Sequence, residues 1–161
     1  MSKPLPDTAY SQLVETPVGS LFLGANNAAL THLAWAKELP LGFVENPNTV
    51  TEQAAQQLKE YFSNERQSFD IKLELEEGTD FQKSVWQEIA TIPLGKTVTY
   101  KNIADKLDSA PRAVGGAVGA NPIPIIVPCH RVVGEKGMIT GFSGGDGIPT
   151  KIKLLEHEGV R

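Results

Sequence analysis

The chain has 161 residues, of which 40% are hydrophobic and 21% charged, which is typical of a globular protein and excludes a disordered or fibrous one. It has one cysteine and three scattered histidines, so an internal disulfide is excluded and we expect neither a metal nor a cofactor. No apolar run approaches the roughly 20 residues of a membrane span, and no apolar signal segment precedes Tyr10. We therefore expect a cytoplasmic protein with no membrane partner.

The first half of the chain has the pattern of a small α/β domain. "YSQLVETPVGSLFLGA" (10–25) predicts two strands joined by a Pro-Gly turn, and "ALTHLAWA" (29–36) predicts a third. "TVTEQAAQQLKEYF" (49–62) predicts a helix with a capping box of Thr49 and Glu52. "FDIKLEL" (69–75) alternates apolar and polar residues, which predicts a half-buried strand.

Near Glu77 both the balance of charged residues and the pattern of predicted elements change. Residues 1–77 carry 5 basic and 11 acidic side chains, whereas residues 78–161 carry 10 basic and 8 acidic ones. The net charge of −4 argues against nucleic acid as a partner of the whole chain, but the second half can approach phosphate without a large electrostatic penalty. We expect two domains, residues 1–77 and 78–161.

The second half predicts short helices. Thr79 is expected to cap one helix and Thr99 a second, over "TYKNIADKL" (99–107). Ser109 is expected to cap a third, with Pro111 at its first position, where no amide hydrogen is needed. The last two helices, separated by "DSA", resemble a helix-turn-helix.

Two further elements are expected before the end of the chain. "VVGEKGMITGFSGG" (132–145) predicts a tight hairpin or a wing, because its glycines favour turns between short extended segments. "PTKIKLLEHEG" (149–159) predicts a last helix that ends at Gly159.

The third predicted helix, "PRAVGGAVGAN" (111–121), contains three glycines. Gly115, Gly116 and Gly119 each cost about 1 kcal/mol relative to alanine in a helix interior. Such a helix is tolerated where another surface comes close to its backbone. That surface is either a neighbouring helix or a nucleic-acid groove, with Arg112 as the long cationic side chain.

The only cysteine, Cys129, lies in "NPIPIIVPCHRVVGEKG" (121–137). In one interpretation it is a small buried hydrophobic residue. In the other, His130 and Arg131 stabilise a thiolate, which lowers the pKa of Cys129 and makes the sulfur a nucleophile. Glu158 is then a candidate partner of His130 in a Cys-His-Glu relay, although it equally fits a solvated helix end.

Three other polar residues have a structural and a functional interpretation. Asn121 either ends the glycine-containing helix or ties it to the cysteine segment. Tyr100 is either a half-buried aromatic residue or a hydroxyl donor to a ligand. Ser143 in "GFSGG" (141–145) either closes a turn or donates a hydrogen bond to a ligand oxygen.

Taken together, these segments resemble one family, the O6-alkylguanine-DNA alkyltransferases, also called methylated-DNA–protein-cysteine methyltransferases. "IVPCHRVV" (126–133) is similar to the active-site signature of the family. The segments "TYKNIA", "RAVGGAVGANPIPI", "GFSGG" and "LLEHEG" occur in the family's order and at similar spacing. The resemblance covers residues 79–159 strongly and the first half only in general shape.

The resemblance implies an α/β (α+β) protein of two domains. An RNase H-like sheet with helices would form the N-terminal domain, and a winged-helix-like domain with a helix-turn-helix would form the C-terminal one. The protein would bind double-stranded DNA through the minor groove, as a monomer. It would transfer an alkyl group from O6-alkylguanine, and from O4-methylthymine, irreversibly and once to its own Cys129.

The resemblance also implies roles for individual residues. Cys129 would be the acceptor, His130 its base through a water, Glu158 the partner of that histidine and Asn121 a hinge amide. Substrate-binding residues would be Tyr100 and Ser143 as donors, Pro124 and Phe142 as pocket walls, and Val132 through its backbone. DNA-binding residues would be Arg112, which fills the gap left by a flipped nucleotide, Ala113 and Gly115. Many members have tyrosine at Phe142, so a hydrogen bond made there is in doubt.

Two other classes of protein remain open. A helix-turn-helix module that recognises alkylated guanine without removing it is disfavoured by Cys129, because the resembling non-catalytic relatives replace that cysteine. A cysteine hydrolase built on Cys129, His130 and Glu158 is disfavoured because no oxyanion-hole motif is evident. Turnover of an ester would indicate the hydrolase, and unmodified protein after exposure to O6-benzylguanine would indicate the binding module.

Overall fold

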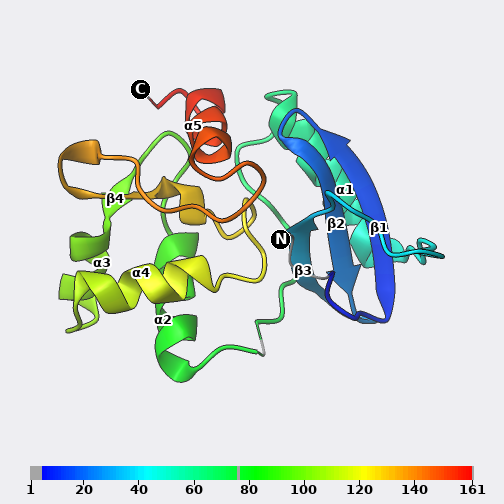
Figure 1. Ribbon diagram of the computed structural model, residues 1–161, viewed down its shortest axis with the longest axis horizontal. Helices are drawn as coiled ribbons and strands as arrows, with labels where there is room; N and C mark the ends of the chain where they lie inside the picture. The colour runs from blue at the N-terminus through cyan, green and yellow to red at the C-terminus, as the bar shows by residue number, and fades with distance from the viewer. Residues whose placement is uncertain (1–4, 76, 161) are drawn as a thin grey trace. The chain divides into compact units, whose positions relative to one another are not determined.

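The computed structural model describes residues 5–75 and 77–160 (Figure 1). The chain forms two compact units, Met1–Glu76 and Glu77–Arg161. In the described ranges no helix combines the length and the apolar character that a membrane span requires.

An antiparallel sheet of order β1-β2-β3 forms the centre of the first unit. Its strands are β1 (Tyr10–Thr16), β2 (Gly19–Ala25) and β3 (Leu30–Trp35), which confirms the three strands predicted from this region. Gly19 follows the turn with φ 113°, a conformation that glycine adopts without strain. The central strand β2 is buried continuously from Leu21 to Ala25, because strands pair with both of its edges and a helix packs on the sheet.

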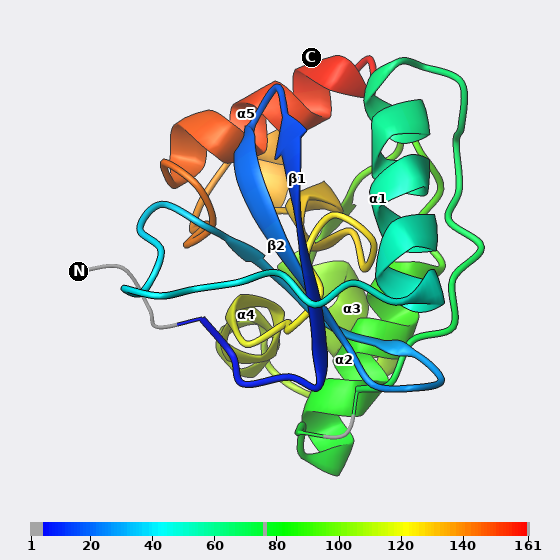
Figure 2. The ribbon, with the colours of Figure 1, turned by 90° about the vertical axis from the view of Figure 1, so that its right-hand side faces the viewer.

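That helix is α1 (Thr49–Phe62), which packs against all three strands (Figure 2). The predicted capping box is wrong, because the N-cap is Asn48. The Asn48 side chain accepts a hydrogen bond from the Thr51 amide, and the Thr51 hydroxyl accepts one from the Asn48 amide. An asparagine side chain offers an oxygen acceptor just as a threonine side chain does. Asn48 therefore caps the helix one residue before the predicted cap, Thr49.

The strand predicted over residues 69–75 does not form. Only Leu73 makes a bridge, in parallel with Leu30 of β3. The Gln57 side chain instead hydrogen-bonds both backbone groups of Asp70, at 2.8 and 3.1 Å. Alternation correctly indicates which side of the segment faces the core, but a strand also needs a partner along its length.

The second unit is made of short helices and a two-stranded parallel sheet. The helices are α2 (Asp80–Ala90), α3 (Tyr100–Lys106), α4 (Pro111–Gly119) and α5 (Ile148–His157). The sheet pairs β4 (Val98–Thr99) with β5 (Val132–Val133). Thr79 and Thr99 cap α2 and α3, as predicted. The buried Trp86 of α2 donates to the Ala117 carbonyl of α4 at 2.8 Å, which joins these two helices.

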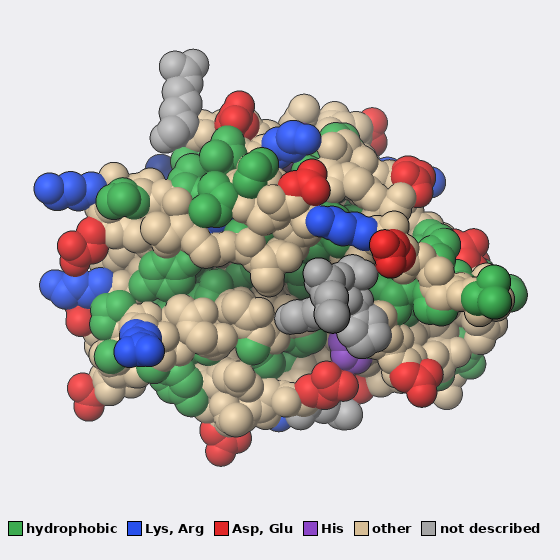
Figure 3. Space-filling view, viewed as in Figure 1, with side chains coloured by type: hydrophobic (Ala, Val, Ile, Leu, Met, Phe, Trp, Pro, Cys, Tyr) green, Lys and Arg blue, Asp and Glu red, His purple; other side chains and the backbone are tan. Residues whose placement is uncertain are grey.

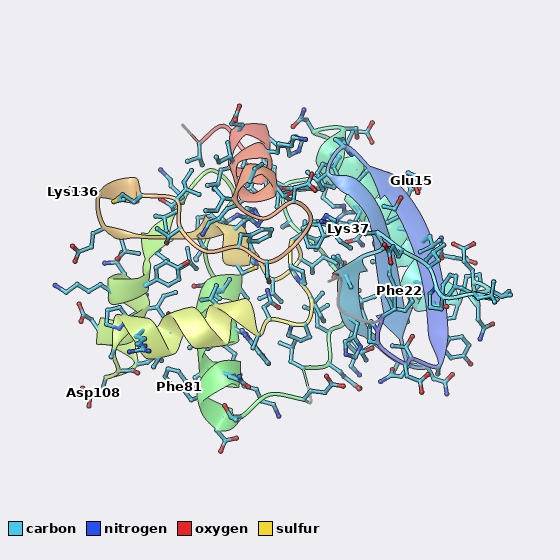
Figure 4. All side chains as sticks on the ribbon, in the orientation of Figure 1. Glu15, Phe22, Lys37, Phe81, Asp108 and Lys136 are labelled. Atoms are coloured by element: carbon cyan, nitrogen blue, oxygen red, sulfur yellow. The ribbon has the colours of Figure 1, made fainter. Side chains whose placement is uncertain are left out.

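One prediction for this unit is wrong, because Ser109 does not cap α4, whose N-cap is Ala110. The Ser109 amide instead donates to the Ala104 carbonyl at the end of α3. Of the two alternatives predicted for residues 132–145, the hairpin does not form, because β5 pairs with β4 and the chain turns through a 3-10 segment, η2 (Glu135–Gly137). The wing is the alternative that remains. Lys136, labelled in Figure 4, lies in that turn with φ 59°.

Candidate functional site

Helices α3 and α4 pack against each other and are joined by residues 107–110, with Asp108 in this turn (Figure 4). A Cβ atom added at Gly116 or Gly119 of α4 would meet no atom within 4 Å, and one at Gly115 would meet only Tyr100, at 4.0 Å. Packing against a neighbouring helix therefore does not explain Gly116 and Gly119. The backbone of α4 is open to close approach from outside, beside the exposed Arg112 and Ala113.

A closed loop leads from α4 to the cysteine. The Asn121 side chain donates to the Val127 carbonyl at 2.8 Å and accepts from the Ile123 amide at 2.9 Å. Within the loop, Ile125 has φ 72°, an outlier for a β-branched residue. Asn121 therefore ties the end of α4 to the cysteine loop.

Cys129 begins a 3-10 turn, η1 (Cys129–Arg131), and is 5% exposed. Burial raises the pKa of Cys129, and hydrogen bonding by Asn121 and the charge of Lys151 oppose this increase only in part. The sulfur is consequently a protonated thiol at rest. The interpretation of a preformed thiolate with a lowered pKa is therefore wrong, and the reaction itself must remove the proton.

His130 is fully buried, and its Nε2 lies 2.8 Å from Oε2 of Glu158. Because a carboxylate only accepts hydrogen bonds, Nε2 carries the ring proton and Nδ1 has the lone pair. Among residues 5–75 and 77–160, no group hydrogen-bonds Nδ1. Burial lowers the pKa of His130, with Glu158 acting in the opposite direction. The structure therefore holds a neutral imidazole with a free acceptor nitrogen next to the thiol residue.

Arg131 does not support the thiol directly. Its Nε and Nη2 donate to the two oxygens of Glu158 at 2.7 and 2.9 Å, and its Nη1 donates to the Ile92 carbonyl at 2.6 Å. The guanidinium and the carboxylate are both buried and form an ion pair, in which each charge is balanced by the other. Glu158 is the C-cap residue of α5, which means that the ion pair links η1 to the ends of α2 and α5.

The sequence analysis missed Lys151 of α5. The side chain is fully buried, and its Nζ lies 2.7 Å from the Val132 carbonyl, 2.8 Å from the Thr140 carbonyl and 3.5 Å from the Tyr100 hydroxyl. Burial lowers the pKa of Lys151, and a thiolate at Cys129 would act against this decrease. Lys151 thus connects the tyrosine, strand β5 and the segment before Phe142.

One signal in the sequence pointed to this burial. Lys151 precedes Leu154 and Leu155 by three and four residues, so all three lie on the apolar face of the helix. A lysine at such a position is usually expected to extend its ammonium group to solvent. The pattern alone did not show whether Lys151 is buried or extends to solvent.

The remaining expected substrate residues occupy the same unit. Tyr100 is half-buried at the start of α3, with its hydroxyl 3.4 Å from the Thr140 carbonyl, and burial raises its pKa. Val132 is buried in β5. Pro124 and Phe142 are half-buried and Ser143 is exposed, so their expected roles stay predictions.

Charged side chains of both signs alternate over the face of the molecule shown in Figure 3. Within the described part of the chain, no group of three His, Cys, Asp or Glu side chains is arranged to hold a metal ion.

Comparisons with known proteins identify the family of the chain. Residues 9–75 match the ribonuclease-like domain of 6-O-methylguanine DNA methyltransferase, and residues 80–160 match its DNA binding domain. The chain therefore belongs to the 6-O-methylguanine DNA methyltransferase family.

Individual relatives resemble almost the whole chain. A methylated-DNA–protein-cysteine methyltransferase of Methanosarcina barkeri is 45% identical over 159 residues, which cover 94% of this chain and 99% of the relative. One of Mycobacterium tuberculosis is 42% identical over 158 residues, which cover 94% and 93%. The crystal structure of Mycobacterium tuberculosis OGT in complex with DNA superposes with a TM-score of 0.81 at 43% identity, covering 92% of this chain and 91% of that one.

Proposed function

We propose that this protein repairs DNA by direct reversal, transferring the alkyl group of O6-alkylguanine to its own Cys129. The observation that carries the proposal is the neutral His130, which has a free Nδ1 and lies next to the buried thiol. Glu158 fixes the tautomer of this base from the other side of the ring. We extend the proposal to O4-methylthymine, whose alkyl group is also bound to an exocyclic oxygen of the base.

The reaction follows from the groups present. His130 Nδ1 removes the proton of Cys129 through a bridging water, and the sulfur attacks the alkyl carbon. The S–C bond forms while the C–O6 bond breaks, and guanine leaves as an anion. We assign the hydrogen bond to this leaving group to the Tyr100 hydroxyl, whose oxygen lies 3.5 Å from Lys151 Nζ.

The product is a thioether at Cys129. A thioether carries no proton to lose and is not hydrolysed by an imidazole or a carboxylate at neutral pH. The chain has no second cysteine to accept the alkyl group from the first. Each molecule is therefore expected to react once.

Helix α4 and Arg112 support a role for this unit in binding duplex DNA. A base inside the stack must be extruded before sulfur can reach it, at a cost of a few kcal/mol. The open backbone at Gly115 and Gly116 allows close approach to a groove, with Arg112 extending from the same helix. We propose that α3 and α4 act as a helix-turn-helix at the minor groove, with Arg112 in the gap left by the base.

The pocket for the extruded base would lie between Tyr100, Pro124, Phe142 and Ser143. The Val132 carbonyl accepts from Lys151. We propose that the backbone at Val132 reads the amino edge of the guanine. We further propose that the protein is cytoplasmic and acts on DNA as a monomer.

The test uses duplex DNA that contains O6-methylguanine with a labelled methyl group. We expect one label per protein molecule on Cys129, and no transfer by Cys129→Ser, because a serine hydroxyl is a much weaker nucleophile. Circular dichroism of the variant serves as the control for folding. Binding without transfer would indicate the recognition module, and more than one equivalent per molecule would indicate a true turnover enzyme.

A further inference from the structure

Arg131 follows the reactive cysteine and histidine directly, yet it contacts neither. Its guanidinium binds both oxygens of Glu158 and the Ile92 carbonyl, as described above. Oε2 of Glu158 receives Arg131 Nη2 at 2.9 Å and His130 Nε2 at 2.8 Å. Resting on the proposed function, we infer that Arg131 is a positioning residue that acts through Glu158 to keep His130 neutral and able to accept the proton of Cys129.

The argument starts from the charge of Glu158. A carboxylate with no exposed side-chain surface needs a full counter-charge, or it takes up a proton or draws one onto a neighbouring base. The base in contact with Glu158 is His130. A protonated imidazole has no lone pair on Nδ1, so it could not accept a proton from the thiol. Arg131 supplies the counter-charge and leaves the imidazole unprotonated.

The charged groups around His130 shift its pKa in opposite directions, according to the sign of their charge. From α5, Glu158 raises the pKa of His130 and Lys151 lowers it, while Arg131 within η1 also lowers it. The end of α2 contributes the Ile92 carbonyl, which is bound to Arg131. Loss of Arg131 would remove one group that keeps His130 neutral and leave Glu158 free to favour the charged imidazole.

The planar fork of arginine fits this task better than lysine does. Two parallel N–H groups bind the two carboxylate oxygens while a third binds the Ile92 carbonyl. A lysine would retain the positive charge but lose this fixed geometry. Arg131→Lys and Arg131→Met therefore separate the effect of charge from the effect of shape.

The experiment follows the His130 ring nitrogens by NMR in the full chain, alongside the pH dependence of alkylation by free O6-benzylguanine. In the wild-type protein we expect a neutral ring protonated at Nε2 at neutral pH. Arg131→Met should move the titration of His130, and the acid limb of the rate profile, to higher pH by about one unit or more. Arg131→Lys should leave both close to the wild-type position, although the protein is less stable.

Controls distinguish this effect from general damage. Arg66→Met removes an arginine from a partly exposed ion pair with Glu60 and should not change the titration of His130. Arg131→Met/Glu158→Gln removes both charges of this ion pair together and should return the titration to the wild-type position or below it. This double variant remains informative if Arg131→Met does not fold.

Three results would overturn the inference. One is a doubly protonated His130 in the wild-type protein at neutral pH, which requires no variant. Another is a titration that stays unchanged in Arg131→Met while only stability falls, and the third is a raised titration in the double variant. Absence of alkyl transfer in the wild-type protein would instead contradict the proposed function, so the two failures are distinguishable.

Discussion

The two units of this protein bury different kinds of polar side chain. In the described part of the first unit, the buried polar residues Ser11, Thr51 and Gln57 are all neutral. In the second unit, the buried set includes four ionisable side chains, which are His130, Arg131, Lys151 and Glu158. The first unit therefore buries polar groups without burying charge, and the second buries a charged network.

The partners of these buried side chains explain the difference between the two units. Thr51 and Gln57 bind nearby backbone groups that would otherwise lack partners, which is a structural task. Buried charges are costly unless paired, and a fold that needed only stability would do as well with apolar residues. The charged groups of the second unit surround a thiol, so we conclude that chemistry, rather than stability, accounts for them.

The largest effect that tests this comparison is on stability. Glu158→Gln should lower the free energy of unfolding by about 3–5 kcal/mol, because Arg131 is then buried without a counter-charge. The partly exposed pair of Arg66 and Glu60, 2.9 Å apart in the first unit, provides the control. Arg66→Met should change stability little, because solvent screens that pair. Urea unfolding measures both, and equal losses would contradict the comparison.

A second effect is the response of stability to acid. Burial lowers the pKa of His130 below its ordinary value of 6.5, so the unfolded chain binds this proton at a higher pH than the folded one. Stability should therefore fall as the pH decreases below 6.5, by up to about 1.4 kcal/mol per pH unit, until the lower folded-state pKa is reached.

The matched variant for this effect is His130→Gln, which does not titrate but still offers an N–H group to Glu158. Its stability should decline less steeply between pH 6.5 and the folded-state pKa of the wild type. Unfolding curves collected across this range would reveal the difference. Identical slopes would mean that His130 is not held neutral by the fold.

The smallest effect compares one glycine from each unit. Gly116→Ala should stabilise α4 by up to about 1 kcal/mol, because a Cβ there meets nothing within 4 Å and alanine favours a helix. At Gly24 of β2 a Cβ would lie 2.6 Å from Thr8 and 3.1 Å from Phe22, so Gly24→Ala should destabilise by about 1 kcal/mol. Thermal unfolding measures both changes.

The same pair of variants separates packing from DNA binding. Gly116→Ala should weaken binding to duplex DNA although the protein is more stable, because the added methyl group lies on the face of α4 proposed to approach the groove. Gly24→Ala should leave DNA affinity unchanged. Unchanged affinity in Gly116→Ala would argue that this glycine has no role at the groove.

Sequence patterns correctly predicted the strands and helices whose alternation, turn or capping residues lie within a few positions of one another. Alternation and a turn glycine specified β1 to β3, and the caps Thr79 and Thr99 were predicted from the helical segments that follow them directly. The same rules misplaced the start of α1, because Asn48 and Thr49 are both suitable caps. They also predicted a strand over 69–75, where the Gln57 side chain competes for the backbone.

The site depends on longer-range contacts that local rules do not contain. His130 and Glu158 are 28 residues apart, and the residues alone offered their contact as one of two alternatives, which the family resemblance favoured. The positions of Arg131 and Lys151 could not be predicted, because the direction of a long cationic side chain depends on which carbonyl or carboxylate the folded chain brings to it. The resemblance gave the reacting residues, and the structure added the charges that control them.

The most direct test of the central claim is the mass of the intact protein after incubation with excess O6-benzylguanine, followed by peptide mapping. We predict that one benzyl group is added per chain, on the peptide that contains Cys129, with no further addition on longer incubation. Unmodified protein, more than one added group, or modification of a peptide without Cys129 would contradict the account.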